Sequence, residues 1–105
     1  MKSKRKGRVG EQELARIFRQ AGYDAYRTWS SGAGREKGDL GGVEIDGFTF
    51  HIECKRQERI DIQKWWEQAI KDCPADQVPT VVFRRNREDW RILLRLEDFL
   101  EFFKK

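Results

Sequence analysis

The chain has 105 residues, of which 38% are hydrophobic and 38% charged, and its net charge is +4 at pH 7. This length suits one small domain, residues 1–105, with a modest core. No apolar run reaches membrane-spanning length and no signal peptide is visible, so we expect a cytoplasmic protein that does not enter a membrane. Two cysteines, without a CxxC motif or a His/Cys cluster, exclude a disulfide scaffold and a zinc site.

Positive charge is concentrated at two places along the chain. Five of the first eight residues are basic, and Arg84, Arg85 and Arg87 form a second group. Clustered positive charge indicates a polyanionic partner, most simply nucleic acid. We expect residues 1–6 to form a mobile basic arm, for which a solubilising tail is the alternative.

The first helix is predicted to run from about Gly7 to Ala21. Apolar residues recur there at helical spacing, and Gly22 is a natural stop. Glu11 lies one turn before Leu14 and therefore flanks the buried stripe. Glu11 is the candidate for a helical glutamate that reaches an active centre. The alternative is that it only favours the positive end of the helix dipole.

A strand is predicted over residues 23–29, followed by a polar, glycine-rich loop over residues 30–38. The hydroxyls of Ser30 and Ser31 and the loop amides suit phosphate binding, and Arg35 and Lys37 add positive charge. The loop lacks the Gly-Lys-Ser/Thr ending of a Walker loop. A flexible connector is the alternative.

The next stretch, residues 39–55, is predicted to be a β-hairpin. Residues 48–55 alternate with period two, which predicts a strand with one apolar face and one polar face. Glu53 and Lys55 share the polar face with His51. Asp46 and Gly47 form a two-residue hairpin turn.

The register of this hairpin decides where Asp39 lies. The turn alone would place Asp39 on the core side. A glycine β-bulge at residues 41–42 adds one residue, so that Leu40 falls opposite Ile52 and Asp39 opposite Glu53. We therefore predict that bulge.

Two carboxylates and an ammonium group on adjacent strands suit metal-dependent phosphodiester hydrolysis. Carboxylate oxygens bind Mg²⁺ or Mn²⁺. The metal polarises the phosphodiester and acidifies a water, while Lys55 steadies the nucleophile or the developing charge. The alternative is a surface pair of Glu53 and Lys55 on an exposed strand, which contributes little energy.

The remaining chain is predicted to form a helix over 62–73, strands over 78–84 and 90–96, and a short helix over 97–103. Asp61 is the predicted N-cap of the first of these helices. Trp65 and Trp66 lie on its apolar stripe, so we assign them to the core or a subunit interface rather than to base stacking. The final helix is aromatic enough that it must dock on the sheet or on a second subunit.

The order of these elements and a set of short motifs resemble the PD-(D/E)xK nuclease superfamily. Within it, the chain is most similar to archaeal-type Holliday junction resolvases, which also occur in phages. The likeness covers roughly residues 6–95, and Gly38 stands where the superfamily motif has proline. The matching residues are Lys6, Gly7, Glu11, Arg27, Ser30, Ser31, Gly32, Asp39, Leu40, Glu53 and Lys55.

The resemblance implies an α/β fold of the restriction-endonuclease type. This fold has an αβββαβ core, with a mixed central sheet flanked by helices, and here an extra C-terminal strand and short helix. The resemblance also implies a homodimer that cuts branched DNA, namely four-way junctions, in a prokaryotic or phage-infected cell. Mg²⁺ would be the cofactor, with Mn²⁺ as a substitute, and no small-molecule substrate is expected.

The resemblance also assigns roles to residues. Glu11, Asp39, Glu53 and the backbone carbonyl of Cys54 would hold the metal. Lys55 would orient the attacking water, and Ser31 or Ser30 would contact the scissile phosphate. The expected DNA contacts are Lys4, Arg5, Lys6, Arg8, Arg27, Ser30, Arg35, Lys37 and Arg56.

Three other functions remain open at this point. The first is a different endonuclease of the superfamily, of the repair or restriction type. The second is a non-catalytic DNA-binding module with the same fold, and the third is a subunit of a larger assembly. Small size without a separate recognition domain argues against base-specific restriction. The intact set of Glu11, Asp39, Glu53 and Lys55 argues against a non-catalytic module.

Overall fold

The computed structural model describes residues 2–28 and 38–104, with side chains from Gly7 onward. The elements run in the order helix, four strands, helix, two strands and helix. Their bounds are α1 Lys2–Gln20, β1 Tyr26–Arg27, β2 Leu40–Gly41, β3 Glu44–Ile45, β4 Phe48–Arg56, α2 Ile62–Asp72, β5 Val78–Arg84, β6 Arg91–Leu93 and α3 Leu96–Phe103.

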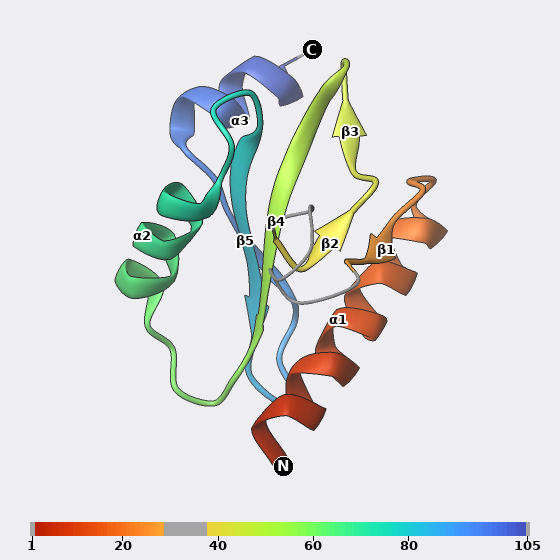
Figure 1. The fold of residues 1–105 in the computed structure, drawn as a ribbon, viewed down its shortest axis with the longest axis vertical. Helices are drawn as coiled ribbons and strands as arrows, with labels where there is room; N and C mark the ends of the chain where they lie inside the picture. Colours follow the sequence, from red (N-terminus) through yellow and green to blue (C-terminus); the bar gives the residue numbers. More distant parts are fainter. Residues whose placement is uncertain (1, 29–37, 105) are drawn as a thin grey trace.

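The described strands form one mixed sheet in the order β1-β2-β4-β5-β6, and β3 pairs with β4 beyond the end of β2. β4 and β5 are parallel and joined by α2, while the other neighbouring pairs are antiparallel. In Figure 1, α1 and α2 lie on opposite sides of this sheet. None of the helices in the described ranges combines the length and apolar character needed to cross a bilayer.

Each face of the sheet has its own apolar cluster. On one face, Leu14 and Ala15 of α1 pack with Phe50, Ile52 and Cys54 of β4. These are the β4 residues that the alternation predicts for the core face. On the other face, the clustered residues come from α2 and β5 and are Trp65, Ala69, Val81 and Phe83. The assignment of Trp65 to the core is therefore confirmed.

The helices begin and end close to the predicted residues, with one exception. α2 spans Ile62–Asp72, and the carboxylate of its N-cap Asp61 accepts a hydrogen bond from the Lys64 amide at 3.2 Å, as predicted. α1 begins at Lys2 rather than Gly7. Residues 2–6 are thus part of the helix and not a separate arm. Lysine and arginine are good helix formers, and no proline lies between Lys2 and Gly7.

The β-bulge predicted in the hairpin is present. Next to the turn, Ile45 pairs with Phe48, but farther along, Leu40 pairs with Ile52. If the register of the Ile45–Phe48 pair continued, Leu40 would lie opposite Glu53. The first strand of the hairpin therefore contains one extra residue between the two pairs. Gly42 supplies it with a φ of +81°, in the left-handed region that glycine tolerates.

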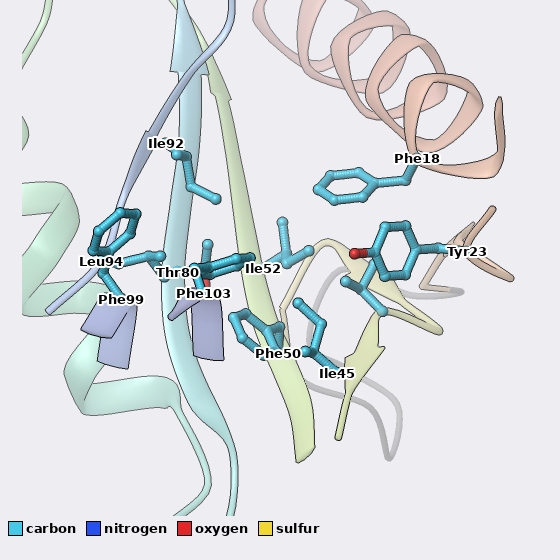
Figure 2. Close-up of a pocket in the computed structure, with 11 residues that line it drawn as sticks. Phe18, Tyr23, Ile45, Phe50, Ile52, Thr80, Ile92, Leu94, Phe99 and Phe103 are labelled. Atoms are coloured by element: carbon cyan, nitrogen blue, oxygen red, sulfur yellow. The ribbon is translucent and has the colours of Figure 1, made fainter. Parts of the chain in front are cut away.

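The final helix, α3, packs through one aromatic residue and leaves others uncovered. Phe102 contacts Phe48 and Phe50 edge to face, with ring centroids 5.3 and 5.2 Å apart. An apolar pocket of about 320 Å³ lies between α3, the sheet and the end of α1. Figure 2 shows Phe99 and Phe103 at one side of it and Phe18 and Tyr23 at the other.

Gly42→Ala is expected to lower the free energy of unfolding by about 2 to 5 kcal/mol. A β-carbon at position 42 would collide with the carbonyl of Asp24. The collision costs about 1 to 3 kcal/mol of stability. A non-glycine residue in the left-handed conformation costs roughly 1 to 2 kcal/mol more. Urea unfolding measures the change.

Gly47→Ala is the matched control, since Gly47 has a φ of +82° but a β-carbon added there would meet no atom within 4 Å. It should lose only about 1 to 2 kcal/mol. Equal losses for the two variants would contradict a special packing role for Gly42.

Candidate active site

Asp39 is fixed against the central strand at the point where β2 begins. Its amide donates to the carbonyl of Ile52 at 2.7 Å. Its carboxylate Oδ2 accepts from the amide of Cys54 at 2.8 Å. The buried hydroxyl of Thr28 donates to the carbonyl of Gly38 at 2.7 Å and so anchors the residue before it. The carboxylate thus takes the place that a strand carbonyl would otherwise occupy beside Cys54.

Glu53 lies on the face of β4 opposite the α1 cluster, but it is not exposed. Only 6% of the residue is accessible to solvent. Its Oε2 lies 2.8 Å from Nε2 of His51, whose side chain is fully buried. The surface-pair alternative is therefore wrong for Glu53. It fails because β4 is a central strand, so that its polar side chains are covered too.

His51 is a residue of the site that the sequence analysis did not single out. Its position two residues before Glu53 on one strand face was the available signal. Its Nδ1 is buried and has no hydrogen-bond partner among the described residues. His51 thus holds Glu53 in place through Nε2.

Glu11 faces the same region from α1. Its Oε1 accepts from Nε of Arg27 at 3.0 Å. Since Arg27 pairs with Leu40 in the sheet, this ion pair ties α1 to the strand beside Asp39. Arg27 was predicted to contact DNA, and in the structure its guanidinium is already engaged by Glu11.

A pocket of about 520 Å³ brings several predicted residues together. Its lining includes Glu11, Asp39, Cys54, Lys55 and Arg56. Glu53, which is turned toward His51, is not part of this lining. The structure therefore brings together Glu11 of α1, Asp39 just before β2 and Lys55 of β4.

The carboxylate of Asp39 is in an unfavourable environment for a negative charge. Burial, together with the charges of Glu53 and Glu11, raises the pKa of Asp39 from 3.8 to about 7. The Cys54 amide and the charge of Lys55 act in the opposite direction without cancelling the effect. The ionised form of Asp39 is therefore disfavoured in the folded protein, chiefly by burial.

The oxygen atoms of this site are of the chemical type that binds a divalent cation. Carboxylates and a backbone carbonyl are the oxygen ligands that such ions prefer, and a cation would balance the charge that raises the pKa of Asp39. Burial also raises the pKa of the Cys54 thiol, so Cys54 has its carbonyl rather than a thiolate to offer. In the described ranges, no three acidic, His or Cys side chains form a ready-made ligand cluster. Glu11 and Glu53 are held by Arg27 and His51 instead.

The predicted DNA contacts are distributed unevenly. Arg8 is exposed on α1. Arg56 lines the pocket, and its Nε is buried without a partner in the described structure. The side chains of Lys4, Arg5 and Lys6 lie outside the described part, as do the whole residues Ser30, Ser31, Arg35 and Lys37.

The second basic group does not form a free cationic patch. Arg84 donates to Glu13 at 2.9 Å, and Arg85 donates to Glu88 at 2.7 Å. These carboxylates neutralise two of the three arginines. The sequence pattern could not show this, because Glu13 lies 71 residues before Arg84.

The fold has a counterpart among solved structures. It matches the structure of Archaeoglobus fulgidus Hjc, described as a Holliday junction resolvase from an archaeal hyperthermophile. The TM-score is 0.58 at 20% sequence identity, and the match covers 85% of this chain and 72% of that one. The protein therefore has the restriction-endonuclease-like α/β fold that the sequence predicts.

The family assignment follows from the sequence match. The model of the family described as "Phage putative PDDEXK endonuclease" matches residues 2–105, and the chain belongs to that family. A search of curated proteins finds no match.

Asp39→Asn is expected to stabilise the protein, kept in a chelator, at pH 8 but not at pH 4. Between pH 3.8 and about 7 the folded protein retains a proton on Asp39 that the unfolded chain has lost. Wild-type stability therefore falls as the pH rises through this window. Asparagine removes the titration and still accepts from the Cys54 amide.

Urea unfolding at pH 4, 6 and 8 measures this difference. Asp89→Asn, at an exposed position, is the control and should leave the pH dependence unchanged. Parallel stability profiles for wild type and Asp39→Asn would contradict a raised pKa at Asp39.

Proposed function

We propose that the protein is a metal-dependent endonuclease that resolves four-way DNA junctions. The observation that carries this proposal is the pocket in which Glu11, Asp39 and Lys55 meet beside the Cys54 backbone. The likeness of the fold to Archaeoglobus fulgidus Hjc supports junctions as the substrate.

The metal would be Mg²⁺, with Mn²⁺ as a substitute, held by Asp39 and the Cys54 carbonyl with Glu11 and Glu53 as further acidic ligands. When bound, the ion polarises the scissile phosphodiester and acidifies a water. The Cys54 carbonyl is a suitable ligand because the amide and carbonyl of one strand residue point to the same side, and the amide of Cys54 already faces Asp39.

The other residues of the pocket act on the substrate. Lys55 lies close enough to Asp39 to lower the pKa of that carboxyl, so its ammonium group is in position to orient the water or to stabilise negative charge as it develops. Ser31, or Ser30, would contact the scissile phosphate. Arg56 and the basic residues of α1 would hold the flanking backbone by charge, which positions DNA without reading its sequence.

A different endonuclease activity is the second candidate, because the family description names an endonuclease without naming its substrate. Cutting linear duplex or flap DNA would use the same carboxylates and lysine. The two functions differ in the shape of DNA that the protein selects.

A cleavage assay separates these functions. The protein is incubated, with and without Mg²⁺, with labelled four-way junction, linear duplex or flap DNA. Paired symmetrical nicks in the junction alone are expected. Asp39→Asn or Glu53→Gln should slow cutting by more than about a hundredfold, because they remove charge that holds the metal, yet leave binding largely intact. Asp89→Asn is the control.

Equal cutting of linear duplex would favour the second candidate. Metal-independent retention of DNA without cutting would leave only a binding module.

A homodimer is part of the proposal, since two cuts in a nearly symmetric junction suit two related active sites. The last helix supports it. Four apolar residues of α3 recur at positions i, i+3, i+4 and i+7 and are between 44% and 72% exposed in the single chain, namely Leu96, Phe99, Leu100 and Phe103. A stripe of this kind is typical of an association surface.

Leu96→Lys with Leu100→Lys is expected to convert the dimer into a monomer, because charged groups would have to be desolvated in the interface. Light scattering after size exclusion measures the mass. Ile70→Lys, at an exposed apolar position of α2, is the matched control and should remain dimeric. A wild-type protein that is monomeric at all concentrations would contradict the dimer.

A further inference from the structure

A second polar pocket lies next to the carboxylate pocket. It has a volume of about 410 Å³ and is formed by the end of β4, the following turn and the start of α2. Lys55 and Gln57 line both pockets. The two pockets therefore adjoin each other at Lys55 and Gln57.

The charge of this second pocket is positive. Lys55, Arg59 and Lys64 line it, against one carboxylate, Asp61. That carboxylate is already used, since its Oδ1 accepts from the backbone amide of Lys64 at the start of α2. The pocket thus presents three cations to one carboxylate that caps a helix.

Two cations of this pocket, Arg59 and Lys64, differ from most arginines of the described structure in their ion pairing. Within the described structure, no ion pair joins Arg59 or Lys64 to a carboxylate. By contrast, four other arginines each lie within 2.7 to 2.9 Å of a carboxylate, namely Arg84, Arg85, Arg91 and Arg95. The positive charge beside Lys55 is therefore available to an external anion.

The aromatic residue of the pocket does not suit base stacking. Trp65 is 4% exposed and packs against Phe83 at a centroid distance of 5.6 Å. Stacking of a nucleobase needs an open aromatic face. The remaining lining, Gln57 and Gln68, offers amide donors that suit phosphate oxygens as well as the cations do.

We propose that this pocket binds a backbone phosphate of DNA that flanks the phosphate held at Asp39 and Lys55. The inference rests on the proposed function for the identity of the neighbouring site, and it adds Arg59 and Lys64 to the DNA-binding residues. The cations outnumber the one carboxylate, which caps α2, and Trp65 is buried. The contact therefore depends on charge and not on base sequence.

Binding of a fluorescent four-way junction, measured by anisotropy in a chelator between 50 and 200 mM KCl, tests this site without any cutting. Arg59→Ala and Lys64→Ala should each weaken binding and reduce the slope of log Kd against log salt by about 0.9, as expected for one lost phosphate contact. Arg59→Lys should keep the slope, because it keeps the charge.

Lys71→Ala is the matched control. It removes the same charge from the same face of α2, two turns or about 10 Å farther along, and Lys71 does not line the pocket. Its slope should equal that of wild type. Slopes for Arg59→Ala and Lys64→Ala that match the Lys71→Ala slope would overturn the inference.

Failure of this inference and failure of the proposed function are distinguishable. If the junction is cut but the slopes do not change, the flanking site is absent and the nuclease stands. If no DNA is cut but the slopes fall as expected, the phosphate contact stands and the nuclease proposal fails.

Discussion

The hydrogen bond from the Cys54 amide to the carboxylate of Asp39 is the constraint on which the site depends. It holds an acidic side chain against the middle of the central strand, at the place where β2 begins. The bond requires Asp39 to lie opposite Glu53, and this register exists only because Gly42 adds a residue to the hairpin. A backbone conformation that glycine tolerates therefore sets the position of the carboxylate.

The charges around this bond show how the protein accommodates buried acids. Glu11 is paired with Arg27, and Glu53 with His51. Burial, with the charges of Glu53 and Glu11, raises the pKa of Asp39 to about 7, and among the described residues the Cys54 amide and Lys55 act against this shift. The three carboxylates therefore differ in their side-chain partners. Asp39 lines the pocket with its carboxylate held by a backbone amide, and an external cation there would favour its ionised form.

Much of this arrangement could be predicted from local patterns. The alternation of residues 48–55, the Asp46–Gly47 turn and the phase of Leu40 together required the bulge, and Asp61 marked the start of α2. These signals are local because strand period, turn chemistry and helix caps involve neighbours in the sequence. Such local patterns could not predict which charged side chains pair with each other. Glu11 and Arg27, or Glu13 and Arg84, meet only after the helix docks on the sheet. The burial of Glu53 likewise depends on what covers β4.

The most direct test of the account is the position of a bound metal ion. Crystals grown with Mn²⁺, with data collected for anomalous scattering, would locate it. We expect a peak within coordination distance of the Asp39 carboxylate and the Cys54 carbonyl, accompanied by Glu11 or Glu53. A well-ordered Asp39 that still accepts from the Cys54 amide, with no peak beside it at saturating Mn²⁺, would contradict the account.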